Sequence, residues 1–144
     1  MPRIERNLDI EAPVNKVFEI LNDTKLGVKW NLAVNEIEEL GLSKYYIKSN
    51  VGDFFSTRIE IAENEKISMK IERGIFNSMG YILASEGANS TNVMIWSEFE
   101  DAKNEKLLAN AGELVLKSLK NYVEYIEEGG DPDSYYKTEI AVTM

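Results

Sequence analysis

The 144-residue sequence contains no cysteine and no histidine. The absence of cysteine excludes disulfides, thiolate nucleophiles and zinc–thiolate sites from this chain. The absence of histidine excludes Ser-His-Asp triads, imidazole acid–base catalysis and histidine-ligated metals. Any chemistry must therefore rely on carboxylates, lysine, arginine, tyrosine and hydroxyl groups, and we expect neither a cofactor nor a metal site.

Basic residues are also few: 16 lysines and arginines stand against 25 acidic residues, which gives a net charge of -9. This charge repels phosphate backbones, so we expect no nucleic acid partner. No apolar run approaches the roughly 18 residues of a membrane-spanning helix, and the start MPRIERNLD lacks the apolar core of a signal peptide. We therefore expect a cytoplasmic protein with no integral membrane association.

Apolar residues alternate with polar ones over most of the chain, which predicts strands joined by short turns. The predicted strands are Ile4–Glu11, Val34–Leu40, Lys44–Val51, Phe54–Ala62, Lys66–Arg73, Ser78–Ser85 and Asn92–Glu100. Helical spacing appears after Pro13, again around Leu26–Trp30, and over Ala102–Glu128, where Gly129-Gly130 predicts the end of a long helix.

This order predicts an α+β protein. Short turns between consecutive strands imply an antiparallel sheet. One sheet face and one helix stripe must cover each other. We therefore expect seven curved strands wrapped around the long C-terminal helix, with two short helices between the first two strands. Residues 1–130 form this domain, and residues 131–144 form a tail in which Tyr136–Met144 alternates like a strand. The tail is interpreted as an extra strand, a disordered end, or a subunit contact that forms a homodimer.

Two segments resemble the START-like superfamily, also called the Bet v 1-like or polyketide cyclase/dehydrase and lipid transport group (SRPBCC). The first is the run Ile10-Glu11-Ala12-Pro13-Val14 with Val17-Phe18, Ile20-Leu21 and Asp23, followed by Trp30. The second, Thr91–Trp96, is similar to the last-strand pattern of that family. The resemblance covers Ile4–Glu128 and implies a helix-grip fold with a hydrophobic cavity between the sheet and the C-terminal helix. Members bind lipids, sterols, polyketides, quinones or plant hormones, and some cyclise or dehydrate polyketides.

Strand parity and helix spacing predict which side chains line that cavity. Hydroxyls among apolar residues suit a ligand pocket, although each of these residues could also serve core packing alone. The predicted lining comprises Phe18, Trp30, Tyr45, Ile47, Ser49, Phe55, Thr57, Ile59, Met69, Ile71, Tyr81, Ile95, Ser97, Ala111, Gly112, Val115 and Leu119. Trp96 has the opposite parity to Val93 and Ile95, and parity does not decide whether Tyr81 or Ile82 points inward.

The sequence leaves three functions open. The first is binding of a hydrophobic small molecule such as a lipid, quinone or polyketide. The second is a cyclase or dehydratase, which would need an acid such as a tyrosine or a buried carboxylate. No catalytic residue is assigned, because the charged strand residues, among them Arg58 and Glu60, fall on the face expected to meet solvent. The third is an interaction or co-chaperone-like module with a filled interior and an exposed patch around Trp96.

Overall fold

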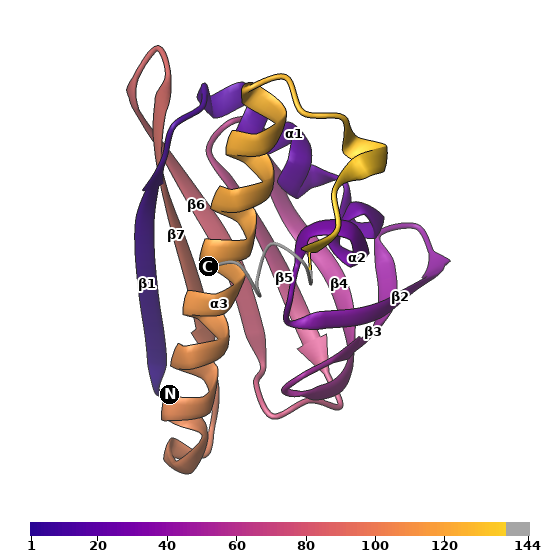
Figure 1. The fold of residues 1–144 in the computed structure, drawn as a ribbon. Helices are drawn as coiled ribbons and strands as arrows, with labels where there is room; N and C mark the ends of the chain where they lie inside the picture. The colour runs from indigo at the N-terminus through magenta and orange to yellow at the C-terminus, as the bar shows by residue number, and fades with distance from the viewer. Residues whose placement is uncertain (138–144) are drawn as a thin grey trace.

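The computed structural model describes residues 1–137. A single curved sheet covers one long helix, with short helices closing one side (Figure 1). Most of the alternation predicted over Tyr136–Met144 lies outside the described residues. None of the helices formed by residues 1–137 is both long enough and apolar enough to span a membrane.

The sheet has seven strands, and every neighbouring pair is antiparallel. Their spatial order is β1-β7-β6-β5-β4-β3-β2, so the first strand pairs with the last. The strands are β1 (Arg3–Ile10), β2 (Val34–Gly41), β3 (Lys44–Ser49), β4 (Gly52–Ala62), β5 (Lys66–Glu72), β6 (Ser78–Gly87) and β7 (Ser90–Glu98). The predicted antiparallel sheet is confirmed, and β1 pairs with β7 because the short helices separate it from β2.

The helices begin and end where the sequence provides caps. Pro13, with φ -62°, precedes α1 (Val14–Asn22), and Asp23 accepts from the Leu26 amide at the start of a 3-10 turn, η1 (Thr24–Leu26). The remaining helical elements are α2 (Gly27–Trp30), η2 (Ala102–Asn104), α3 (Glu105–Glu127) and η3 (Pro132–Ser134). The long helix α3 lies across the concave face of the sheet and packs chiefly on β1 and β7 (Figure 1). The predicted helix-grip architecture is confirmed.

One part of the core, which we call the packed end, lies where α1 and the second half of α3 meet β1 and β7. Its side chains have no exposed surface: Ile10, Val17, Val93, Leu119 and Val123. The Thr91 hydroxyl is also fully buried here, and it donates to the Ala12 carbonyl over 2.8 Å. Apolar and polar groups are thus both fully satisfied at the packed end.

The outer face of the sheet carries Trp96, as its opposite parity to Ile95 predicts. The guanidinium of Arg3 lies 4.4 Å from the centre of the Trp96 ring. The ring covers Gly80, where an added Cβ would lie 2.7 Å from a ring carbon and 2.7 Å from the Ile67 carbonyl oxygen. Gly80 is therefore needed because no side chain fits beneath the indole.

Residues 131–137 fold back onto the domain. The Tyr135 ring is buried and lies 4.9 Å from the Tyr122 ring and 5.0 Å from the Tyr125 ring. The Lys137 ammonium donates to the carbonyls of Asn31 and Val34, at 2.8 and 2.7 Å. This part of the tail is a 3-10 turn followed by a docked segment, so it holds the connection between α2 and β2 against α3.

Candidate functional site

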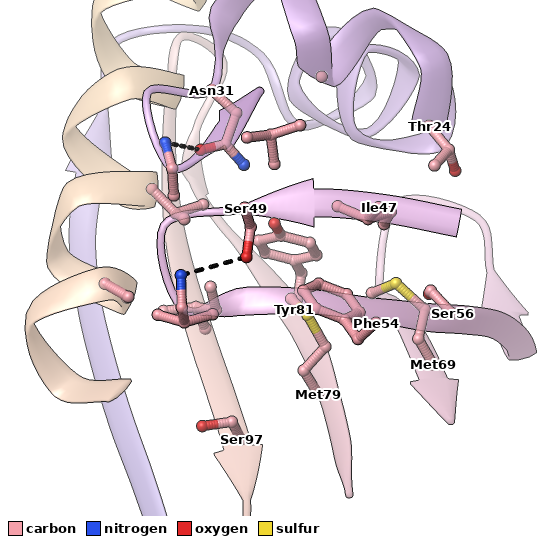
Figure 2. Close-up of a pocket in the computed structure, with 18 of the residues that line it drawn as sticks. Thr24, Asn31, Ile47, Ser49, Phe54, Ser56, Met69, Met79, Tyr81 and Ser97 are labelled. Carbon is pink, nitrogen blue, oxygen red and sulfur yellow. Dashed lines mark hydrogen bonds between the residues drawn. The ribbon is translucent and has the colours of Figure 1, made fainter. Parts of the chain in front are cut away.

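A cavity of about 140 Å³ lies between the sheet, α2 and the first half of α3. Figure 2 shows its labelled side chains converging from β3, β4, β5, β6 and β7. The lining is mostly apolar, with Ile47, Phe54, Met69 and Met79 on the sheet and Val115 on α3. A cavity of this volume with apolar walls is large enough for a ring-sized molecule, since an engineered protein cavity of about 150 Å³ binds benzene.

Helix α3 contributes small residues to the cavity wall. Ala111 and Gly112 both line it. A Cβ added at Gly112 would lie 3.4 Å from the nearest side-chain atom, on Ile95, which is ordinary contact. The close approach of α3 to the sheet therefore does not require glycine at this position. A glycine inside a helix can allow a close approach of the backbone to a neighbour, or it can leave space beside a cavity. The contact distance at Gly112 agrees with the second explanation.

Three residues of the cavity lining each have a buried polar side-chain atom without a hydrogen-bond partner. Among the described residues, these are the only fully buried side-chain nitrogen or oxygen atoms without one: Trp30 Nε1, Arg58 Nε and Ser97 Oγ. All three residues line the cavity. A buried polar group without a partner costs about 1–3 kcal/mol, so native proteins leave few of them. All three belong to residues that line one cavity, which makes this cavity the candidate site.

Arg58 is the cationic residue of the lining, and it is held at the corner after α1. Its terminal nitrogens donate to Asn22 Oδ1 over 2.6 Å, to the Asn22 carbonyl and to the Thr24 hydroxyl. None of the ion pairs formed within residues 1–137 involves Arg58. Burial lowers the pKa of Arg58, against the charge effects of Tyr45, Asp23 and Tyr81. The guanidinium stays charged at neutral pH, because an arginine is effectively always protonated.

Tyr81 places a hydroxyl in the same cavity. The side chain is 8% exposed and points inward from β6, whereas Ile82 is 39% exposed on the other face. Burial raises the pKa of the Tyr81 hydroxyl, and the charge of Arg58 opposes this only in part. Tyr81 therefore remains a protonated hydrogen-bond donor across the physiological pH range.

The cavity contains few groups suited to acid–base chemistry. Asp23 is the one carboxylate in the lining, and its exposed side chain caps η1 by accepting from the Leu26 amide. Within residues 1–137, no cluster of three or more acidic side chains is arranged to hold a metal ion. A catalytic role would thus rest on Arg58, Tyr81 and the free hydroxyl of Ser97.

Ten predicted lining residues surround the cavity together. They are Trp30, Ile47, Ser49, Met69, Tyr81, Ile95, Ser97, Ala111, Gly112 and Val115. Phe18, Ile71 and Leu119 are buried in the core away from the cavity, and Tyr45 is a half-buried residue packed against that core. Phe18 and Leu119 serve packing where α1 and the second half of α3 meet the sheet, whereas Tyr45 and Ile71 pack within the core from β3 and β5.

The inward assignment of Phe55, Thr57 and Ile59 is wrong. Cross-strand partners share a sheet face, and the register pairs Ser56 with the buried Ile71 and Arg58 with Met69. Residues of the opposite parity face outward, and Ile59 is 62% exposed. Parity misled here because β4 has apolar residues on both faces: Phe54 faces inward, whereas Phe55 and Ile59 lie on the outer face. The Phe55 ring is covered there by Tyr46, at 4.9 Å between ring centres.

Because the two faces of β4 were exchanged in the prediction, the inward residues of this strand were not predicted to line the cavity. The sequence assigned Arg58 to solvent, while the structure places it with Phe54 and Ser56 in the lining. Strand patterns also say nothing about connections, so the lining residues of the α1–α2 corner and of the turn before β2 were missed. These residues include Leu21, Thr24, Gly27, Asn31 and Ala33. The sequence feature that could have predicted these residues is Trp30, because it lies among them in the cavity lining.

Comparisons with known proteins match the fold alone. No family model matches the sequence, and no curated protein matches it. Solved structures do match. A START superfamily protein from Mycobacterium smegmatis is 17% identical with a TM-score of 0.78, over 86% of this chain and 98% of that one. The ZhuI aromatase/cyclase from Streptomyces sp. R1128 is 14% identical with a TM-score of 0.74, over 90% and 99%.

A third match is the Aha1 dimer from Colwellia psychrerythraea, at 19% identity and a TM-score of 0.70, over 86% of this chain and 97% of that one. These three proteins share the sheet-and-helix architecture at identities that carry no functional detail. The chain therefore has the helix-grip fold of the START-like, or Bet v 1-like, superfamily.

Proposed function

We propose that this protein binds a hydrophobic small molecule, of the lipid, quinone or polyketide type, in the cavity between the sheet and α3. The observation that carries the proposal is the grouping of Trp30 Nε1, Arg58 Nε and Ser97 Oγ, all unpartnered, around one apolar cavity. Apolar walls with a few converging polar groups are the usual form of a small-molecule site. The protein would carry out this role in the cytoplasm.

Native mass spectrometry of the protein purified from its own cells tests this function. A reproducible extra mass that disappears after denaturing extraction is the expected result. The variant Ala111→Leu, which fills part of the cavity, should carry less of this mass. Ala102→Leu changes an exposed alanine in η2 and serves as the matched control. A bare chain in every sample, with no thermal stabilisation by fatty acids, quinones or aromatic ketones, would exclude the proposed function.

A cyclase or dehydratase is the second candidate, favoured by Arg58 and Tyr81 lining one cavity. The aromatase/cyclase with the same fold makes the comparison relevant. Tyr81 would donate a hydrogen bond to one substrate oxygen and Arg58 to a neighbouring one, so that both stabilise the negative charge that develops on these oxygens during cyclisation. Incubation with an aryl β-polyketone should then give a cyclised product in the wild type and little in Tyr81→Phe. Equal conversion by wild type, Tyr81→Phe and buffer would exclude this candidate.

An interaction module with a filled interior has less support, because the interior holds a cavity and the Trp96 ring is covered by Arg3. We further propose a homodimer that uses the C-terminal tail, and a dimer is known for one protein of this fold. Deleting residues 138–144 keeps the contacts of Tyr135 and Lys137. Light scattering should then show a change from dimer to monomer, and an unchanged mass would exclude a contact through the tail.

A further inference from the structure

The charge of Arg58 distinguishes this cavity from a purely apolar one. The guanidinium is half-buried, and its partners Asn22, Thr24 and the Leu21 carbonyl are all neutral. Asp23 is the one carboxylate nearby in the lining, but it is exposed to solvent and turned toward the Leu26 amide. A buried charge is costly unless an opposite charge or several hydrogen bonds compensate it. The Nε donor is buried without a partner in the protein, and Arg58 is part of the cavity lining, so an anion bound beside it would complete the set.

The strand register sets the length of the site. Arg58 pairs with Met69, Met69 with Met79, and Met79 with Ser97. These four residues form one row across the inner face, as the part from Met69 to Ser97 in Figure 2 shows. Adjacent strands lie about 4.8 Å apart, so the row spans about 14 Å. A charged donor lies at one end, two thioethers lie in the middle and an unpaired hydroxyl lies at the other end.

The available volume limits the ligand to a compact body. A cavity of about 140 Å³ matches the volume that holds a single aromatic ring, and it is too small for a diacyl lipid. Methionine side chains are flexible and polarizable, so Met69 and Met79 suit either a ring or a short chain. The body of the ligand therefore lies over the middle of the row.

The donors favour a monoanion over a dianion. Arg58 carries a single positive charge, both of its terminal nitrogens already donate to neutral oxygens, and Tyr81 adds a neutral hydroxyl to the same cavity lining. A phosphate dianion would carry one charge without compensation into an apolar cavity, which is costly. A carboxylate matches a single positive charge and can accept from both donors.

We propose that the ligand is a small apolar monocarboxylate whose carboxylate accepts from Arg58 Nε and whose ring-sized body lies over Met69 and Met79. This inference rests on the proposed binding function and specifies its ligand class. The acid can come from an aromatic or an aliphatic source, since both present the same charge and a similar apolar volume.

Calorimetry with matched acid and ester probes tests the ligand class. The probes are 3-phenylpropionate and octanoate, each compared with its methyl ester, at neutral pH. Hydrogen bonds to a charged group are strong enough that the acid should bind about tenfold or more tightly than its ester. Preference for one acid over the other identifies the aromatic or the aliphatic source. Esters that bind as well as the acids would overturn the proposal and leave the proposed function standing, whereas no binding by any probe contradicts both.

The variant Arg58→Gln should remove the preference for the acid while leaving ester binding in place. Arg73→Gln, which removes an exposed arginine outside the cavity, is the matched control and should keep the preference. A preference that survives in Arg58→Gln would overturn the assignment to Arg58. Because Arg58 also donates to Asn22 and Thr24 at the corner after α1, circular dichroism checks that the Arg58→Gln variant is folded. If the variant is unfolded, it does not enter the comparison. The acid-to-ester ratio of the wild type then decides the ligand class by itself.

Discussion

At the packed end, the buried Thr91 hydroxyl donates to the Ala12 carbonyl, whereas the buried Ser97 hydroxyl near the other end of the same strand has no partner. Ser118, on the second half of α3, likewise donates to the Leu114 carbonyl and accepts from the Leu32 amide. Around the cavity, Trp30 and Arg58 each keep a free donor. One core thus contains a region in which buried hydrogen bonds are complete and a region in which they are not.

The two regions differ in how completely their buried polar groups are paired. Complete packing and pairing stabilise a fold and need no other molecule. Free polar groups beside a void destabilise a fold, and their presence is typical of functional sites. The helix-grip architecture allows both, because α3 lies directly on β1 and β7 while α2 and the concave strands leave space beside it.

The largest expected effect on stability is at the packed end. Leu119→Ala removes a side chain with no exposed surface and should lower the free energy of unfolding by about 2–5 kcal/mol. Met69→Ala in the cavity wall should cost less, because the side of Met69 that faces the void has few contacts to lose. Urea denaturation of both variants measures the difference. Equal losses would show that the two regions are packed alike.

The sequence predicted most of the fold because its periodicities change at element boundaries. Alternation over Lys66–Arg73 and helical spacing over Ala102–Glu128 each correspond to one observed element, β5 and the η2–α3 segment. Face assignment succeeded where one parity is clearly apolar, as in β7, where Val93 and Ile95 are buried and Trp96 faces outward.

Assignment failed in β4, where the inner face holds Ser56 and Arg58 and the outer face holds Phe55 and Ile59. The rule that inward residues are apolar fails here, because the inward residues Ser56 and Arg58 are polar. Only the pairing of Arg58 with Met69 reveals its orientation. Leu119 was predicted to line the cavity but lies in the packed core. The prediction failed because helical spacing does not distinguish a residue in a cavity wall from one in a solid core.

Substitutions at two buried glycines are expected to change stability by smaller amounts. Gly80→Ala would place a Cβ 2.7 Å from the Ile67 carbonyl oxygen, and we expect a loss of about 1–3 kcal/mol from this overpacking. Gly112→Ala faces the cavity at ordinary contact distance from Ile95, and better helix propensity should raise stability by up to about 1 kcal/mol.

Urea denaturation followed by tryptophan fluorescence measures both glycine variants. Gly41→Ala is the control, because an added Cβ at Gly41 would meet no atom within 4 Å. A destabilised Gly112→Ala variant would mean that α3 approaches the sheet too closely there to leave room for a ligand.

The smallest expected effect separates the two hydroxyls of β7. Thr91→Val keeps the side-chain shape but leaves the Ala12 carbonyl without its partner, which should cost about 1–2 kcal/mol. Ser97→Ala removes a hydroxyl that has no partner in the protein, so stability should stay unchanged or rise slightly. Thermal and urea denaturation of the ligand-free protein measure both. If Ser97→Ala were as destabilising as Thr91→Val, its hydroxyl would already be satisfied in the free protein, and the contrast between the packed end and the cavity would rest on Trp30 and Arg58 alone.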